Sequence, residues 1–270
     1  MEKIRVLTAL LTLSLFSTTA CKPKVNTISQ VQVTNGILTK NGEFPEVLML
    51  ISETGRCTGT FVNDHQMLTA AHCVQDAKEL SVGEPRLGSP LFGIRTIAKA
   101  ESWVIHPNFL QQLDSTYDLA LVNFPKGTSP GKFAKISSQG AALAENVLIV
   151  GYGNSVIDRQ LNQGQLSEFG SGFKRQGVNK IEARDQGLLR FFGFLSEQEA
   201  KKRNLKPGQR ALSAEGDSGG PMFNARGEII GISSAAEPSV TGSGQILNYW
   251  SLYVDLSSDS SKSFLKDLKN

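Results

Sequence analysis

Residues 215–221 are Glu215-Gly216-Asp217-Ser218-Gly219-Gly220-Pro221, and they place one serine among residues that suit an oxyanion-binding turn. The glycines allow the positive φ angles that tight turns need. Taken alone, the stretch also fits an ordinary turn in which the aspartate bonds to nearby backbone. If Ser218 is a catalytic nucleophile, it needs a base within hydrogen-bond reach and a third group that orients the base.

The base would come from one of three histidines. His65 lies in a polar turn, and His106 precedes Pro107, which favours an extended or turn conformation at the surface. His72 ends the run Met67-Leu-Thr-Ala-Ala-His-Cys73, where an apolar strand passes into small residues that leave the imidazole room. We therefore predict His72 as the base; the alternative is a packed core histidine.

The acid that orients the base should be buried. Residues 117–122 place Asp118 at the head of an otherwise apolar strand pattern. Asp118 is therefore the predicted orienting acid, with a strand-end cap as the alternative role.

The order His72, Asp118, Ser218, with Ala-Ala-His-Cys and Gly-Asp-Ser-Gly-Gly-Pro both intact, resembles the chymotrypsin-like (trypsin family) serine proteases. Residues 150–154 and 231–234 are similar to two further segments of that family, a Gly-Trp-Gly segment and a substrate-binding strand. The resemblance extends from about Val33 to the C-terminus. It implies a serine endopeptidase that cleaves polypeptides through an acyl-enzyme, without a cofactor.

An all-β fold is predicted from many short apolar or alternating segments separated by Gly, Pro, Asn and Ser. The resemblance implies two six-stranded antiparallel β-barrels, at about 33–125 and 143–256, with the site in the cleft between them. A capping box at Ser196–Glu199 predicts a short helix before Pro207, and Asp259–Asn270 predicts a docked C-terminal helix. The alternatives are a polar loop and a frayed tail. The expected strands are 47–51, 57–62, 67–70, 94–98, 119–124, 147–150, 228–232 and 249–256.

The resemblance also gives roles to the residues around Ser218. The backbone N–H groups of Gly216 and Ser218 would form the oxyanion hole, and Asp217 would pair with a new amine at Val33 after a propeptide is cut away. Gln32 precedes the cut. Since Gln32 is neither Arg nor Lys, the activating protease would not be of the trypsin type.

The same correspondence places the specificity pocket at Leu212 and Ser213, and at Ala235 and Ala236 after Ser234. No acid stands at Leu212, and a buried acid is what would pair with Arg or Lys of a substrate. An apolar P1 residue is therefore expected, with plain core packing of Leu212 as the alternative.

The N-terminus has the pattern of a bacterial export signal in residues 1–20: a basic start, an apolar run and small residues. That run is too short for a membrane span, which needs about 20 apolar residues. Cys21 then resembles the lipid-modified first residue of bacterial lipoproteins; an unmodified thiol or another cleavage point is the alternative. Residues 21–32 would be a tether or propeptide. The protein is expected to be exported, either secreted or periplasmic, and to contact a membrane only through a lipid on Cys21.

Export permits a disulfide, and Cys57 and Cys73 have the spacing of the family's histidine-loop bridge. The resemblance thus implies a Cys57–Cys73 bond, whose loop length is typically worth about 3 kcal/mol. Two unpaired buried thiols are the alternative.

Other classes of protein fit the sequence less well. The net charge of +3 gives no footprint for nucleic acid. Two of the three histidines lack partners with metal-ligand spacing, so no metal site is expected. An esterase of the α/β-hydrolase type would need a histidine after its serine, and none follows Ser218. The main alternative is a non-catalytic, protease-like binding module at the surface.

Overall fold

The computed structural model of this chain describes residues 33–86, 93–153, 172–193, 197–240, 242 and 246–266. The expected export signal, Cys21 and the segment before Val33 lie outside these residues. Ser196 and the last four residues of the expected C-terminal helix also lie outside them. Within the described part of the chain, no helix is both long and apolar enough to cross a membrane.

Seven of the described strands form one antiparallel sheet, in the order β6-β5-β2-β3-β4-β8-β7. Phe61, Met67 and Val82 are fully buried in the core of this sheet. Strand β4 is buried along its whole length, as its central position between β3 and β8 requires. The strands are β2 (Val47–Ser52), β3 (Arg56–Phe61), β4 (Gln66–Thr69), β5 (Leu80–Pro85), β6 (Ile94–Lys99), β7 (Ser102–Ile105) and β8 (Ala120–Asn123).

Eight further described strands form a second antiparallel sheet, in the order β1-β10-β9-β13-β14-β15-β12-β11. Its core includes Ile149, Phe191, Leu212 and Tyr253. The strands are β1 (Ile37–Leu38), β9 (Asn146–Gly151), β10 (Arg175–Lys180), β11 (Ala183–Asp185), β12 (Leu188–Gly193), β13 (Pro221–Phe223), β14 (Ile229–Val240) and β15 (Ile246–Asp255).

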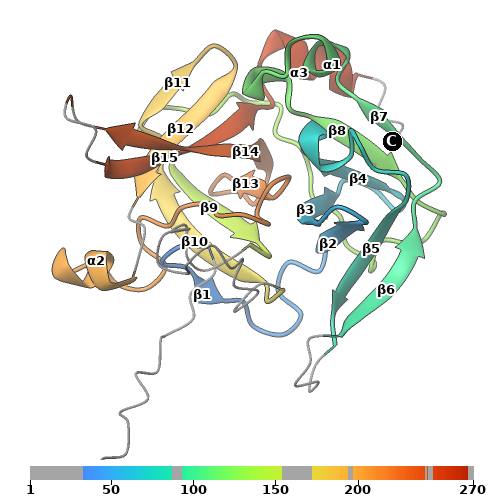
Figure 1. Ribbon diagram of the computed structural model, residues 1–270, viewed down its shortest axis with the longest axis horizontal. Coiled ribbons are helices and arrows are strands. Elements are labelled where there is room, and N and C mark those ends of the chain that lie inside the picture. Colours follow the sequence, from blue (N-terminus) through green and yellow to red (C-terminus); the bar gives the residue numbers. More distant parts are fainter. Residues whose placement is uncertain are drawn as a thin grey trace, which may run out of the picture.

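The two sheets lie side by side (Figure 1). They pack against each other through a shared apolar cluster. Met49 and Leu68 contribute from the first sheet, and Val150, Phe223 and Ile232 contribute from the second. The cluster joins central strands of the two sheets, and the candidate site forms where the two sheets meet.

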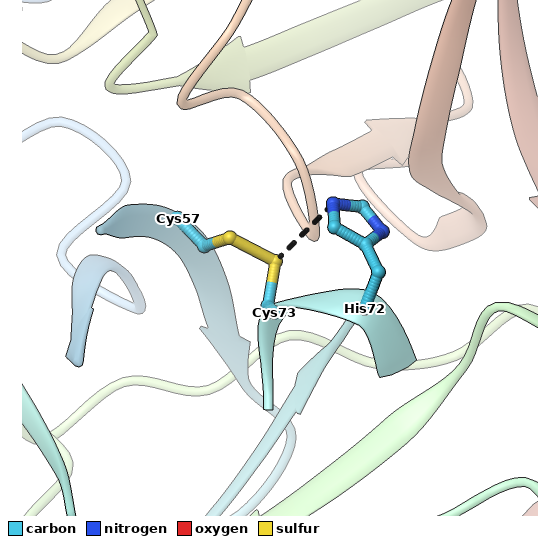
Figure 2. Close-up of side chains that lie close together, drawn as sticks. All are labelled: Cys57, His72 and Cys73. Atoms are coloured by element: carbon cyan, nitrogen blue, oxygen red, sulfur yellow. Dashed lines mark hydrogen bonds between the residues drawn. A yellow bond between two sulfur atoms is a disulfide. The ribbon is translucent and has the colours of Figure 1, made fainter. Parts of the chain in front are cut away.

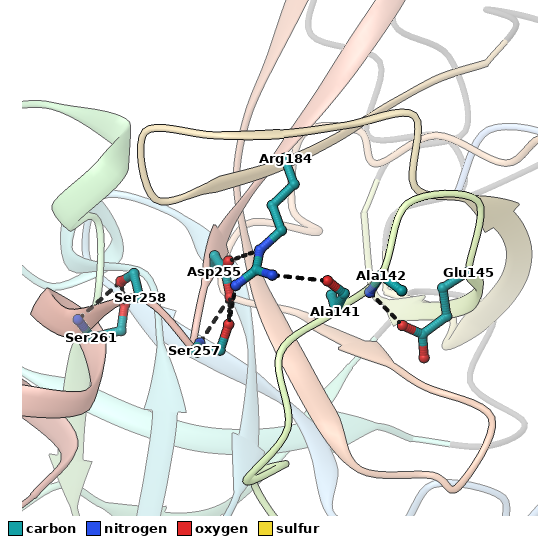
Figure 3. Close-up of polar contacts among 8 residues, drawn as sticks. All are labelled: Ala141, Ala142, Glu145, Arg184, Asp255, Ser257, Ser258 and Ser261. Atoms are coloured by element: carbon teal, nitrogen blue, oxygen red, sulfur yellow. Dashed lines mark hydrogen bonds and ion pairs between the residues drawn. The ribbon is translucent and has the colours of Figure 1, made fainter.

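An arginine on β11 ties the segment between the two sheets to the end of β15 (Figure 3). Arg184 Nε donates to Oδ2 of Asp255 at 2.7 Å, and its other nitrogens donate to the carbonyl of Ala141 at 3.1 Å and to Ser257 Oγ at 2.7 Å. Asp255 is buried, so its charge is compensated within the fold.

The last described helix returns to the first sheet, where it lies beside α1 (Figure 1). Ser258 caps it, accepting the N–H of Ser261 at 3.1 Å. Ser260 Oγ lies 2.9 Å from Nε2 of His106, whose ring centroid is 5.2 Å from that of Phe264. The helical elements are η1 (Ala71–Cys73), α1 (Pro107–Gln112), η2 (Ser115–Tyr117), α2 (Glu197–Lys202) and α3 (Asp259–Leu265).

The all-β prediction, with two antiparallel β units and a C-terminal helix, is confirmed. The described sheets have seven and eight strands where six each were expected. Short edge strands account for part of the difference, since β1 has 2 residues and β11 has 3.

Candidate active site

His72 lies in the short helix η1, directly after β4. Ala70 and Ala71 are fully buried, and their small side chains let this turn pass close to the second sheet. The side chain of His72 is 34% exposed, so one edge of its ring is open to solvent.

The disulfide that the resemblance implied joins Cys57 on β3 to Cys73 in η1. Figure 2 shows the His72 ring beside it, with Nε2 3.7 Å from the sulfur of Cys73. These three residues form a cluster of potential metal ligands. Because the two sulfur atoms are bonded to each other, neither offers a thiolate to a metal.

Asp118 follows η2 and is 2% exposed. Its Oδ1 accepts the backbone N–H of His72 at 2.9 Å, and its Oδ2 accepts the ring Nδ1–H at 2.7 Å. Ser234, on β14 of the second sheet, donates its hydroxyl to the same Oδ2 at 2.6 Å. A carboxylate can only accept hydrogen bonds, so the proton of the neutral ring lies on Nδ1 and Nε2 carries a lone pair.

The turn that carries Ser218 packs closely against the segment that leads to His72. Gly219 has a φ of +79°, and a Cβ there would lie 2.1 Å from Thr69 Oγ1 and 2.9 Å from the backbone nitrogen of Ala70. Only glycine fits this position. The carbonyl of Ser218 accepts the N–H of Thr58 at 2.8 Å. Among the described contacts, no hydrogen bond joins the Ser218 hydroxyl to the His72 ring.

The backbone N–H groups of this turn fall into two sets. Those of Asp217, Gly219 and Gly220 donate to the carbonyls of Ala214, Ser233 and Asp217 at 2.8–2.9 Å. Those of Gly216 and Ser218 donate to no acceptor in the described part of the chain. The turn thus leaves two backbone N–H groups, one on each side of Asp217, without an acceptor among the described residues.

Asp217 is buried beneath this turn, at 2% exposure. Its Oδ1 accepts the N–H of Gly153 at 2.7 Å, and its Oδ2 accepts the N–H of Ala214 at 2.8 Å. Burial raises the pKa of its carboxyl to about 7, while these two hydrogen bonds and the charge of Arg175 act in the opposite direction.

Val33 packs against the second sheet although the chain is uncleaved. It is 1% exposed, and Thr34 beside it exchanges backbone hydrogen bonds with Leu212 at 2.9 and 3.2 Å. Val33 therefore lies next to the segment that leads into the Ser218 turn.

The residues expected to line the specificity pocket have different surroundings. Leu212 is fully buried in the core of the second sheet. Ser213 is buried as well, and its hydroxyl contacts Ser251 Oγ at 3.0 Å and the Tyr253 hydroxyl at 3.1 Å. Ser234 bonds to Asp118 and is not a free pocket group. Ala235 is half-buried and Ala236 is exposed.

Several residues of the site gave no signal in the sequence. Thr58, next to Cys57, donates its hydroxyl to the carbonyl of Gly216 at 2.8 Å and accepts the N–H of Tyr152 at 3.1 Å. The hydroxyls of Ser251 and Tyr253 were also not foreseen. Their roles depend on contacts between distant strands, which no local motif records.

Comparison with known proteins points to one family. The family model Trypsin matches residues 33–256. Vitamin K-dependent protein C of Rattus norvegicus is 24% identical over 248 residues, covering 81% of this chain and 48% of the relative. The Mus musculus protein of the same name is 25% identical over 247 residues, with 81% and 48% covered. The chain thus spans about half the length of these curated relatives.

The fold has a solved counterpart. A structure of a Glu endopeptidase in complex with MPD matches with a TM-score of 0.59 at 14% identity, covering 87% of this chain and 97% of that one. At this identity the likeness shows the fold alone. Since the family model spans most of its length, the chain belongs to the trypsin family.

Proposed function

We propose that the chain is a serine endopeptidase in which Ser218 is the nucleophile, His72 the general base and Asp118 the orienting acid. The observation that carries the proposal is the bond of Asp118 to His72 Nδ1 at 2.7 Å, which leaves Nε2 as a proton acceptor. Nε2 takes the hydroxyl proton of Ser218 as its oxygen attacks a peptide carbonyl, and then gives this proton to the leaving amine. Water attacks the resulting acyl-enzyme by the same route and releases the acid.

The negative charge that develops on the carbonyl oxygen is stabilised by the N–H groups of Gly216 and Ser218. Their lack of a protein acceptor in the described residues supports this role. One such donor is typically worth about 3 kcal/mol of transition-state stabilisation.

Maturation is proposed to cut the chain before Val33, so that the new amine binds Asp217. The burial of Val33 and the bonds of Thr34 to Leu212 support this docking. The export signal in residues 1–20, the lipid on Cys21 and an activating protease other than a trypsin-type one belong to the same proposal. N-terminal sequencing and mass measurement of the exported protein test these steps together. A mature start at Val33 is consistent with all of them. Retention of residues 1–20 would contradict the export signal.

The S1 pocket is proposed to take an uncharged P1 residue, with an apolar one preferred. Leu212 at the proposed floor is apolar and packs in the core, Ser213 after it is neutral, and Ala235 and Ala236 place only small side chains at the proposed wall. We expect kcat/KM for peptides with Leu or Phe at P1 to exceed that for matched peptides with Arg. A preference for Arg would contradict this assignment.

The catalytic assignment is tested with a serine-reactive fluorophosphonate probe. Wild-type protein should be labelled at Ser218, and Ser218→Ala should lose the label while keeping the wild-type melting temperature. Ser81→Ala, a serine on β5 of the first sheet, is the matched control and should label normally. A folded wild-type protein that takes no label would instead indicate the non-catalytic binding module.

A further inference from the structure

The buried carboxylate of Asp217 occupies a slot that two glycines leave open. A Cβ on Gly151 would lie 2.1 Å from its Oδ1, and a Cβ on Gly153 would lie 2.5 Å from its Oδ2. The carboxylate therefore takes the place that the side chain of residue 151 would occupy. Two backbone N–H groups are its hydrogen-bond donors, and a buried charge also needs a compensating positive charge.

Arg175 is in a position to provide this charge. It begins β10 and lies directly opposite Gly151 in the antiparallel register. Directly opposite residues point to the same face, with Cβ positions about 5 Å apart. Because Asp217 fills the side-chain position of Gly151, Arg175 and the carboxylate share one face of the β9–β10 pair. Arg175 is 7% exposed, so solvent screens its electrostatic interaction with the carboxylate of Asp217 only a little.

The two groups influence each other's ionisation. The positive charge of Arg175 lowers the pKa of Asp217, and the negative charge of Asp217 raises the pKa of Arg175 against the effect of burial. Tyr253, from β15, also faces Asp217; burial is the main cause that raises its pKa, and Asp217 adds to it, so Tyr253 stays neutral. Lys174, the residue before Arg175, donates instead to the carbonyls of Glu43 and Phe44. The second cation considered for Asp217 is the α-amine of Val33, which exists only after cleavage.

We propose that Arg175 is a positioning residue that keeps Asp217 ionised in the uncleaved chain, so that the Gly216–Ser218 turn is set for catalysis before an amine forms at Val33. This inference rests on the proposed serine peptidase function. Cleavage before Val33 then adds a second cation to a turn that is already ordered, and it is not an obligatory switch for activity.

The alkaline pH profile separates the two cations. An α-amine loses its proton at about pH 8 in model peptides, a lysine at about 10.4 and an arginine above 12. Burial lowers the pKa of the neighbouring Lys174 to about 8, so Lys174→Met in the uncleaved chain, verified by N-terminal sequencing, gives the reference profile. This reference should be active, with a kcat that stays flat to about pH 10. Arg175→Lys should keep most of the activity at pH 8 and gain an alkaline decline. A role in packing alone would not produce this decline.

Arg175→Met removes the charge and keeps much of the stem. At pH 6, below the carboxyl pKa of about 7, its kcat in the uncleaved chain should fall by about tenfold or more with little change in KM, because below the pKa each further unit of raised carboxyl pKa removes about a factor of 10 in the ionised form. Wild-type kcat and an unchanged alkaline profile in Arg175→Met would overturn the proposal. So would an uncleaved wild-type chain that labels with fluorophosphonate only after cleavage before Val33.

A stability measurement keeps the test independent of the peptidase assignment. In the Ser218→Ala background, Arg175→Met should lower the melting temperature more at pH 8, where Asp217 is charged, than at pH 5. The raised pKa gives this sign, since the cost of the charge appears as the pH rises from 3.8 through about 7. Equal losses at both pH values would refute the Arg175–Asp217 coupling. Absence of labelling at any pH, with unequal losses, would refute only the peptidase function.

Discussion

Asp118 holds His72 at two points: its Oδ1 accepts the backbone N–H at 2.9 Å, and its Oδ2 accepts the ring Nδ1–H at 2.7 Å. One acid therefore fixes both the position of the turn and the tautomer of the ring. Because Ser234 donates to the same acid from the other sheet, both sheets contribute to the hydrogen bonds around Asp118.

Asp118→Asn should abolish most of the activity while leaving the fold intact. An amide has only one acceptor oxygen for the three donors that meet at Asp118, and it cannot stabilise the imidazolium. The expected loss in kcat is about 10⁴-fold. Steady-state kinetics with a peptide substrate, together with circular dichroism of the variant, give the measurement. A loss below tenfold would argue against His72 as the base.

Ser234→Ala removes one donor to Asp118 and leaves the His72 contacts in place. A hydrogen bond to a charged group contributes about 1.5–3 kcal/mol, so kcat should fall by roughly 10- to 100-fold with KM nearly unchanged. Ser239→Ala, farther along β14, is the control and should keep wild-type kcat. If KM rises while kcat is unchanged, Ser234 serves substrate binding and not the acid.

The strands that the sequence predicts are those whose buried face is apolar. The expected segments 47–51, 67–70, 119–124 and 147–150 coincide with β2, β4, β8 and β9. Strand β10 was missed because its buried positions are Arg175, Gly177 and Asn179, which give no hydrophobic alternation. Asn179 is satisfied there by donating to the carbonyls of Phe192 and Ala211.

Sequence motifs point to candidate residues such as His72 and Ser218. They do not reveal the positions of residues whose surroundings depend on tertiary contacts. His106 was expected at the surface, which is wrong: it is 4% exposed, because α3 folds back over it. Its partner Ser260 is 154 residues away in the sequence. Ser234 was placed near the substrate pocket, and its bond to Asp118 depends on the packing of two sheets.

The burial of His106 predicts an acid-sensitive contact between α3 and the first sheet. Nδ1 accepts the N–H of Asn108 at 3.2 Å, and Nε2 lies 2.9 Å from Ser260 Oγ. Burial lowers the pKa of His106 below 6.5. The neutral form is thus favoured in the folded state, and its contribution to stability is present above pH 6.5 and is lost as the pH falls through the lowered value.

His106→Asn tests this contact, since asparagine also caps helices and does not titrate. The melting temperature of the wild type should drop more between pH 7 and pH 5 than that of the variant. Asp217 acts with the opposite sign over this range but is common to both proteins, so it cancels in the comparison. Parallel profiles of melting temperature against pH would show that protonation of His106 does not cause the loss of stability.

Gly219→Ala should collapse the turn that holds Ser218, and the chain offers a matched control in Gly227→Ala. Both glycines have similar positive φ angles, +79° and +73°, so both alanines carry about 1–2 kcal/mol of backbone strain. Only at Gly219 does the new Cβ meet other atoms, at 2.1 Å from Thr69 Oγ1 and 2.3 Å from the carbonyl of Thr58. Overpacking adds about 1–3 kcal/mol there. Urea unfolding should show a larger loss of stability for Gly219→Ala than for Gly227→Ala. Fluorophosphonate labelling should be lost in Gly219→Ala and kept in Gly227→Ala. Equal losses of stability in the two variants would mean that the His72 segment does not support the Ser218 turn.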